Sequence, residues 1–415
     1  MTQPASRARH VAGPLVARGP HRRIVQLLAA APDGLKQREL IAGTGLARSS
    51  ISLLLADLAS VVDVSPDARQ TGGRPRRVHR IRADKGVVAG VDVGNYRVHV
   101  TLADLTGVPL DDAAPAEQRI LQDKTPMIAE RTLDATARLI RSELARVGKP
   151  LDQLAAVGVS LPGAVPRGAR TTIDPSLPLW HSADVPAFLG ARLEPGVTVT
   201  LEHEATAAMR AERRWGEART VESALFVEWS STISAGMLIG GETWRGNRGM
   251  AGDLGHICLP LDDTERDLLL PEDKPLHHSC PHCAQMACVA QLAGGLRMAQ
   301  LFGVGTIEEG DRLLKHDERM RETTQAMARL LGRAIGVAAA VVDPELVIVG
   351  GGASPETLGT GYEALCRGAL ETARPRTPRI ELSALGTQAA IRGAIAGAVD
   401  EGIVRYLIRV LEQGG

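Results

Sequence analysis

Residues 225–256 read LFVEWSSTISAGMLIGGETWRGNRGMAGDLGH, and this stretch decides the fold. It has the frame of a phosphate-binding hairpin, in which residues without a Cβ let backbone N–H groups close on phosphate oxygens. Here the positions of closest approach carry side chains: Ser230, Ser231, Thr232 and Ser234. Only Gly236 remains, at the end of the loop. The stretch therefore predicts that the scaffold was kept while nucleotide chemistry was lost, which favours a sensor over an enzyme.

Length and composition indicate a globular chain of more than one domain. With 415 residues, the chain is too long for a single compact core, so we expect two or three domains. Hydrophobic residues make up 44% and charged residues 23%, but aromatic residues only 2%. The core must therefore be built mainly from Ala, Val, Leu and Ile.

The charge is unevenly distributed along the chain. Residues 1–82 hold 14 Lys and Arg against 5 Asp and Glu, although the whole chain has 48 of each kind. A basic head on an acidic body predicts a polyanionic partner for the head alone.

Targeting signals are not evident in the sequence. No run of about 18 apolar residues occurs, so we expect no membrane span. The N-terminal stretch is basic but has no sustained apolar segment, which argues against a signal peptide. We therefore expect a cytoplasmic protein, in which clustered cysteines indicate metal binding sooner than disulfides.

The basic head has the pattern of a winged helix-turn-helix. After an N-terminal arm expected to be disordered up to about Pro20, a helix follows from His21 with Ile24, Leu27 and Leu28 on one face. Two further short helices are expected around a turn at Gly43-Thr44-Gly45, with Leu35, Leu40 and Ile41 in the first of them. This arrangement is typical of DNA-binding helix-turn-helix domains, although a solvated helical hairpin would look similar.

The second of these helices and the segment after it supply candidate DNA contacts. Arg and Ser at the start of a recognition helix are suitable donors to phosphates and base edges. The stretch 61–84 reads as two strands around Thr71-Gly72-Gly73, and its GGRPRR tip suits a narrow minor groove, unless it is a solvated linker. The candidates are Arg48, Ser49, Ser50, Ser52, Gly73, Arg74, Arg76 and Arg77.

From Lys85 onward, the chain resembles the ROK family, which groups repressors, open reading frames and sugar kinases. Two strands are expected around Gly94-Asn95, with Asp92 at the end of the first. The segments that fall on family motifs are Gly94, Leu161-Pro162-Gly163, Gly246-Asn247-Arg248-Gly249, Gly252-Asp253-Leu254-Gly255-His256 and Asp343-Pro344 through Gly352. Together with the winged head, the chain resembles the repressor branch, which includes xylose and N-acetylglucosamine regulators.

The resemblance implies an α/β chain, with a winged helix-turn-helix followed by a two-lobed actin-like (ribonuclease H-like, ASKHA) ROK domain that binds sugar in a cleft. The expected division is a DNA-binding domain at 1–82, a first lobe at 83–202 joined by the returning segment 387–415, and a second lobe with a zinc site at 203–386.

The sugar-binding positions of the family are altered here. The general-base Asp of family kinases corresponds to Glu204, one methylene longer, and a misplacement of about an ångström costs roughly 10²-fold in rate. The family Asn corresponds to His203, one family Glu to Asp253 and another to Ala290, while His256 is retained.

Unpaired polar groups in a buried site are costly, so the pocket either binds a different ligand or binds none. Asn247 and Arg248 are further candidates for the effector site, and the Arg suits an anionic effector unless it faces solvent.

A metal site is expected at His256 and the run Cys280-Pro-His-Cys283-Ala-Gln-Met-Ala-Cys288. In the family, one His and three Cys often hold zinc, and here the first cysteine interval is one residue longer, which is itself a common zinc spacing. We expect one structural zinc per chain, with His277, His278 and His282 as rival ligands and metal-free thiols as the alternative. Cys258 and Cys366 are expected in the core.

The combined interpretation is a DNA-binding transcriptional regulator that acts as a repressor and has a catalytically degenerate effector domain. The expected partners are a pseudo-palindromic double-stranded DNA operator, a small-molecule effector and a second copy of the chain in a homodimer or higher oligomer. We expect the dimer face on the helices around Glu308 to Ala340 or on the C-terminal helix. The alternatives are a ligand-independent regulator and an active sugar kinase with a DNA-binding head.

Overall fold

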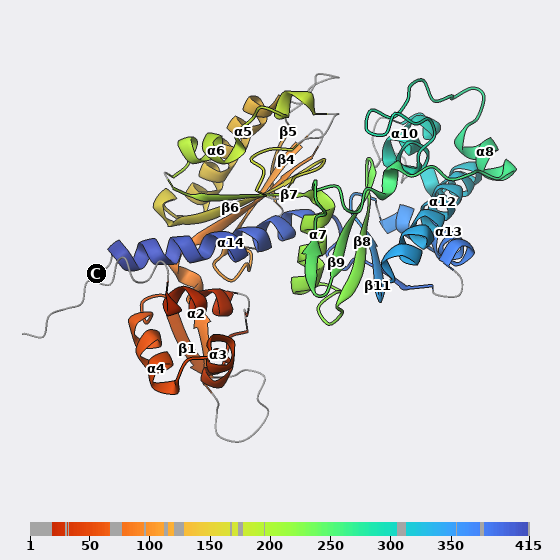
Figure 1. The fold of residues 1–415 in the computed structure, drawn as a ribbon. Coiled ribbons are helices and arrows are strands. Elements are labelled where there is room, and N and C mark those ends of the chain that lie inside the picture. Colours follow the sequence, from red (N-terminus) through yellow and green to blue (C-terminus); the bar gives the residue numbers. More distant parts are fainter. Residues whose placement is uncertain are drawn as a thin grey trace, which may run out of the picture.

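A small helical head leads into two separate sheets, each covered by helices (Figure 1). In this computed structural model the described residues run from 19 to 413, except 30, 32, 67–76, 95–96, 112–114, 120–127, 167, 173–176, 195, 305–312, 354 and 374–376. The expected fold class is confirmed, because N-terminal helices with a two-stranded hairpin precede two α/β lobes. The N-terminal arm up to residue 18 lies outside the described residues.

The described part of the head contains three helices and one hairpin: α2 (Pro20–Ala29), α3 (Gln37–Thr44), α4 (Arg48–Asp57), β1 (Val62–Pro66) and β2 (Arg77–Ile81). The strands pair antiparallel, with Val62 opposite Ile81 and Pro66 opposite Arg77. One apolar side chain from each helix is fully buried in the head: Ile24, Leu40 and Ile51. The two wing strands are confirmed, whereas the tip of the wing lies outside the described residues.

Two details of the head differ from the sequence-based expectation. Helix α3 continues through Gly43 and Thr44, so the turn begins only at Gly45, whose φ of 70° is the left-handed cap that glycine favours. Leu35 lies before α3 instead of within it, because its backbone exchanges hydrogen bonds with His79 of β2. The wing is thereby fastened to the entrance of the helix-turn-helix.

The sheet of the first lobe has the order β5-β4-β3-β6-β7. Its strands are β3 (Val87–Val93), β4 (Arg97–Asp104), β5 (Ala116–Arg119), β6 (Leu154–Leu161) and β7 (Thr198–His203). The helices α5 (Ala129–Arg146) and α6 (Val185–Arg192) share a core with Val87, Ala89 and Val91. The intervening Val88 shares another core with α14 (Ala389–Gln413), so β3 is covered on both faces and reads as a continuous apolar run.

The sheet of the second lobe has the order β10-β9-β8-β11-β12. Its strands are β8 (Ser223–Trp229), β9 (Ile233–Ile239), β10 (Glu242–Trp244), β11 (Leu346–Gly350) and β12 (Arg379–Leu382). Its helices are α7 (Glu204–Trp215), α8 (Asp263–Leu269), α9 (Val289–Ala293), α10 (Gly295–Phe302), α12 (Glu318–Val342) and α13 (Pro355–Ala373). Short 3-10 turns span Ala83–Lys85, Leu151–Gln153, Pro178–Trp180, Leu254–His256 and Gly386–Gln388.

Alternate residues of β8 face two different helical layers. Leu225, Val227 and Trp229 belong to the core that α12 covers. Ala224 and Phe226 belong instead to a smaller core with α7. The next residue on this α7-facing side of the strand is Glu228, by the alternation of side chains along a strand.

The head and the first lobe share one hydrophobic core. Ile24 and Leu28 of α2 belong to the same buried cluster as Ile403 and Leu407 of α14. Figure 1 shows the end of α14 lying between the head and the sheet of the first lobe. The head is therefore packed against the body and not merely tethered to it.

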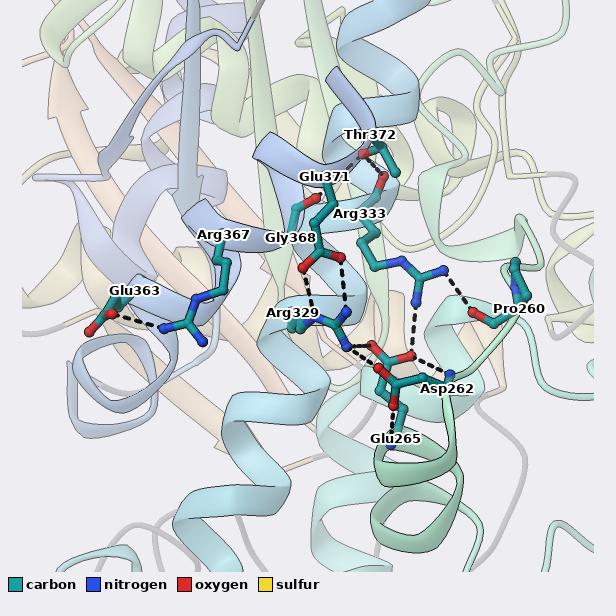
Figure 2. A network of polar contacts seen from close by, with 10 residues as sticks. All are labelled: Pro260, Asp262, Glu265, Arg329, Arg333, Glu363, Arg367, Gly368, Glu371 and Thr372. Atoms are coloured by element: carbon teal, nitrogen blue, oxygen red, sulfur yellow. Dashed lines mark hydrogen bonds and ion pairs between the residues drawn. The ribbon is translucent and has the colours of Figure 1, made fainter. Parts of the chain in front are cut away.

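An ion-pair network fastens α8 to the two long helices of the second lobe (Figure 2). Glu265 of α8 has an almost fully buried side chain and accepts hydrogen bonds from Arg329 and Arg333 of α12. Arg329 also makes a two-pronged ion pair with Glu371 of α13. This network holds the segment that leads into the cysteine run.

Helix α12 is long and apolar enough, by length and composition, to cross a membrane. More than half of its most apolar window (56%) is buried inside the fold. Since its side chains form much of the core of the second lobe, the apolar character of this helix is explained by packing.

Candidate effector site and metal centre

Polar side chains of the first lobe gather at the carboxyl ends of its parallel strands. Asp92 of β3 lies beside Ser160 of β6, and the Ser160 hydroxyl donates a 3.0 Å hydrogen bond to it. His99 of β4 lies 3.9 Å from Asp92 and 3.0 Å from Glu117, and these two carboxylates raise the pKa of its imidazole against the opposing effect of burial. Ligands of α/β sheets bind at such carboxyl ends.

Glu228 of the second lobe reaches the same region. It lies near the carboxyl end of β8, opposite Ser234 of β9 and beside Gly350 of β11. The side chain is buried, at 7% exposure for the residue, and within the described part of the chain its Oε2 atom has no hydrogen-bond partner. Burial raises the pKa of Glu228 well above its ordinary value, and repulsion from Glu204 and Asp92 raises it further. The charges of Glu204 and Asp92 therefore act on Glu228 at the junction of the two lobes.

The turn between β8 and β9 makes its backbone hydrogen bonds within the protein. The backbone N–H of Ser230 donates to the carbonyl of Thr232, and the carbonyls of Ser230 and Ser231 accept from Gly295 and Leu296 at the start of α10. The Ser230 hydroxyl lies against Gly352, where an added Cβ would come within 2.7 Å. The side chain of Ser230 thus fills space beside the glycine turn that follows β11.

Gly236, the glycine kept in the hairpin, has a structural use. A Cβ at this position would lie 2.0 Å from the backbone carbonyl of Ala205 in α7. The start of α7 therefore rests directly on β9, and Glu204 is held near Glu228 by this contact. The retention of Gly236 needs no phosphate to explain it.

The candidate effector residues are brought together only in part. His203 is the N-cap of α7, and its Nδ1 accepts from the backbone N–H of Ala205, while Glu204 is the first residue of the helix. Asn247 and Arg248 are exposed in the segment after β10. Asp253 lies 3.6 Å from the Nε2 atom of His256.

A second buried contact crosses between the lobes beside His203. Glu202 of β7 pairs with Arg210 of α7 and with Arg245, which follows β10. Burial alone would raise the pKa of Glu202, but the two arginines outweigh burial and lower it. Sequence reasoning did not single out this ion pair.

Four side chains form a compact candidate metal centre: His256, Cys280, Cys283 and Cys288. Their donor atoms all lie within 4.8 Å of one another, and the His256 Nδ1 atom lies 3.3 Å from the Cys280 sulfur. A tetrahedral zinc ion with bonds of about 2.0–2.3 Å needs donors about 3.6 Å apart, so this geometry fits zinc.

The chemistry of this cluster also fits a cation. Burial raises the pKa of the Cys288 thiol to about 12, and the neighbouring cysteines add to the effect. A bound cation is what would hold such sulfurs as thiolates.

The cysteine loop has the strained backbone of a tight knuckle. Ala284 and Ala287 have φ values of 56° and 63°, a left-handed conformation that costs a non-glycine residue about 1 kcal/mol or more. Such strain persists where the surroundings over-determine the loop, as a bound ion would.

The rival ligands are placed outside the cluster. His282 stacks on His256 with ring centroids 4.6 Å apart, and His277 and His278 are exposed. Asp253 beside the Nε2 atom of His256 is suited to orient the ring toward the sulfurs.

The expectation for Cys258 is wrong, since this cysteine is exposed. Ile257 faces the lobe core and, by the alternation of extended backbone, Cys258 points away from it. Cys366 is half-buried against the core of the second lobe.

The start of α4 is open to solvent. Arg48, Ser49 and Ser52 are exposed and Ser50 is half-buried, while Arg77 at the wing is exposed. Gly73, Arg74 and Arg76 lie outside the described residues. One face of α4 is therefore left uncovered by the residues that the structure describes.

Sequence reasoning missed three residues, of which two lie on the exposed face of the head and one lies at the junction of the lobes. Leu53 of α4 is 69% exposed, beside Ser49 and Ser52 on the helix surface, and an apolar side chain there suits a thymine methyl group. Gln37 of α3 donates a 2.7 Å hydrogen bond to Ser52 and so joins the same surface. Glu228 was visible as a charge inside an apolar strand, which is the signal that could have identified it.

Comparisons with known proteins extend over most of the chain. A family model described as "ROK family" matches residues 88–401, which is well over half of the sequence. A putative xylose repressor of Caldicellulosiruptor sp. (strain Rt8B.4) is 23% identical over 354 residues, covering 80% of this chain and 82% of the relative. An N-acetyl-D-glucosamine kinase of Citrobacter koseri is 25% identical over 319 residues, covering 74% of this chain and 97% of the kinase.

One solved structure aligns with almost the whole chain. It is described as a ROK family transcriptional regulator, a homolog of the E. coli MLC protein, and has a TM-score of 0.72 at 17% identity. The alignment covers 95% of this chain and 98% of that one. At this identity the likeness shows the shared fold alone.

Proposed function

The chain belongs to the ROK family, and on that premise we propose that it is a DNA-binding transcriptional regulator, acting as a repressor in the cytoplasm, whose body is a sensor without kinase activity. The observation that carries this proposal is the basic head, with the exposed start of α4 and a core shared with the body. The sequence match to a putative xylose repressor covers 80% of the chain, against 74% for a kinase, and supports it.

DNA contacts are assigned to the exposed face of the head. Arg48, Ser49, Ser50 and Ser52 would contact base edges and phosphates from α4, with Leu53 against a thymine methyl group. Gly73, Arg74, Arg76 and Arg77 would follow the minor groove from the wing. A single head reads one half-site, so a homodimer on a pseudo-palindromic operator is part of the proposal.

The dimer is proposed to form through the second lobe. Val341 at the end of α12 is 83% exposed, and Leu370 of α13 is 42% exposed. Apolar residues uncovered on two helices that pack together are suited to an isologous contact. Light scattering of the purified protein, with Val341→Glu as the disrupting variant, tests this part.

The loss of kinase activity is supported by the hairpin turn and Glu228. Backbone groups of Ser230 and Ser231 are used within the protein, and a carboxyl group lies where the lobes meet. We assign effector binding to His203, Glu204, Asn247, Arg248, Asp253 and His256. A zinc ion held by His256, Cys280, Cys283 and Cys288 would be structural, since four ligands complete its shell.

Genome-wide footprinting of the protein tests the central proposal, because discrete protected sites would identify the operator. Arg48→Ala should then weaken binding to that operator by about 10-fold or more, since a base or phosphate contact is worth about 1–3 kcal/mol. Arg138→Ala, an exposed arginine on α5 of the first lobe, is the control and should bind normally. Absence of any sequence-selective protection would refute the regulator.

Two alternatives make different predictions. An active sugar kinase would turn over ATP with a hexose at rates above roughly 1 s⁻¹. A ligand-independent regulator would show operator binding that no small metabolite alters, and no metabolite would raise its melting temperature.

A further inference from the structure

The carboxyl groups at the junction of the two lobes would repel a phosphate and attract a cation. We infer that Glu228, Glu204 and Asp92 bind an organic ammonium group, so that the ligand of this junction is a small amine. This inference rests on the proposed function in one respect, because it names the chemical class of the effector.

The first argument is the state of Glu228. Its Oε2 atom is buried and has no hydrogen-bond partner among the described residues, although a buried polar atom left unsatisfied is destabilising. The two charges that act on it, those of Glu204 and Asp92, are both negative. A ligand that donates hydrogen bonds and carries positive charge satisfies the atom and relieves the repulsion together.

The second argument is an independent hydroxyl group. Ser234 is directly opposite Glu228 in the β8–β9 pair, so both side chains lie on the same face of the sheet. The Ser234 hydroxyl is also buried, at 8% exposure for the residue, and without a hydrogen-bond partner. Two neighbouring side chains on one face that both lack hydrogen-bond partners indicate that a ligand supplies those partners.

A bare metal ion fits this junction less well than an amine. In the described part of the chain, the one group of three or more His, Cys, Asp or Glu ligand atoms within 4.8 Å of one another is the His256 cluster. Asp92, Glu204 and Glu228 are therefore too widely spaced for all three to ligate one ion. An ammonium group with its attached carbon chain, donating in several directions, spans such a site.

The three carboxyl groups differ in the partners that the protein itself gives them. Glu204 is the first residue of α7, and the positive end of the helix dipole stabilises its carboxylate. Asp92 is similarly supported by Ser160 and His99. The Oε2 atom of Glu228 has no such partner in the described part of the chain, so Glu228 is the carboxyl group that most needs one from a ligand.

Matched pairs of small molecules test the inference on the purified full-length protein. Putrescine and glucosamine should raise the melting temperature by about 2 °C or more at saturation, whereas 1,4-butanediol and glucose should not. Equal shifts within each pair, no shift with either amine, or a shift with magnesium chloride or phosphate in place of the amines would each overturn the inference.

Variants assign the binding to the junction. Glu228→Gln should weaken amine binding in calorimetry by about tenfold or more, because one charge-assisted hydrogen bond is lost. Glu204→Gln provides a second variant should the first fail to fold, and Glu363→Gln on the exposed side of α13 should bind normally. Unchanged affinity in both junction variants contradicts the assignment.

The closing measurement separates this inference from the proposed function. Footprinting without ligand tests the regulator, while the melting shift tests the amine site without DNA. Protein that protects discrete DNA sites but ignores both amines would refute the inference and leave the regulator standing. Protein that binds amines but no DNA would do the reverse.

Discussion

Two glutamates at the residue scale make similar ion pairs in different surroundings (Figure 2). Glu265 is buried and accepts from Arg329 and Arg333, whereas Glu363 is exposed and pairs with Arg367 four residues later. Glu265→Ala should lower the free energy of unfolding by about 3–5 kcal/mol, because two arginines lose a buried partner. Glu363→Ala should lower it by about 0.5 kcal/mol or less. Urea denaturation measures both, and equal effects would contradict the role of burial.

Glu228 predicts a pH dependence of stability. Burial raises its pKa in the folded protein above the unfolded value of 4.5, so the folded state holds the proton more tightly. The stabilisation is complete below that unfolded value and is lost as the pH rises toward the higher folded pKa. Glu228→Gln should remove this part of the slope and should be more stable than the wild type at neutral pH. Denaturation at several pH values checks this, and parallel curves for the two proteins would disagree with it.

The cysteine cluster predicts a metal dependence. Cys283→Ser should lose the zinc ion, because three remaining ligands bind far more weakly than a complete shell. Elemental analysis should fall from about one zinc per chain to near zero, with a lower melting temperature. Cys366→Ser, outside the cluster, should keep its zinc. Full zinc occupancy in Cys283→Ser would remove this residue from the ligand set.

At the scale of elements, the wing and the recognition helix should contribute differently to DNA binding. Replacing Arg74 and Arg76 by Ala should weaken binding to all sequences and reduce the slope of log affinity against log salt by about 1–2, if both contact phosphate. Anisotropy titrations at several salt concentrations measure the slope. An unaltered slope would show that the arm does not touch phosphate.

Elements with a clear period were predictable from sequence, and contacts between distant elements were not. The strands around Gly94 and the paired wing strands follow from apolar alternation and turn residues, and the structure confirms them. Leu35 was assigned to a helix because its periodicity fits, but its backbone pairs with β2, which periodicity does not reveal. The candidate metal centre was predictable because the spacing of the cysteines is itself typical of zinc sites.

The charge at the lobe junction could not be predicted in the same way. Glu228, Glu204 and Asp92 come from three elements, and their proximity is a result of the fold. The hairpin residues predicted a loss of phosphate binding, but they did not predict that a carboxyl group faces the junction.

For the molecule as a whole, α7 joins the lobe junction to the head. It begins at Glu204, and near its other end Arg214 pairs with Asp400 of α14 and donates to the backbone carbonyls of Ala29 and Thr106. Arg214→Ala should increase hydrogen exchange in α2 while leaving α12 unchanged, because the contact with Ala29 is lost. Arg367→Ala should change neither helix. Unaltered exchange in α2 would exclude Arg214 as a link.

The core that α2 shares with α14 restricts how this protein can be recombined. Replacing the head by that of another protein would leave Ile403 and Leu407 against an unmatched surface, and a body expressed alone would expose them to water. Substitutions on the outer face of α4 leave this core intact, whereas exchange of the whole head also requires a redesigned α14.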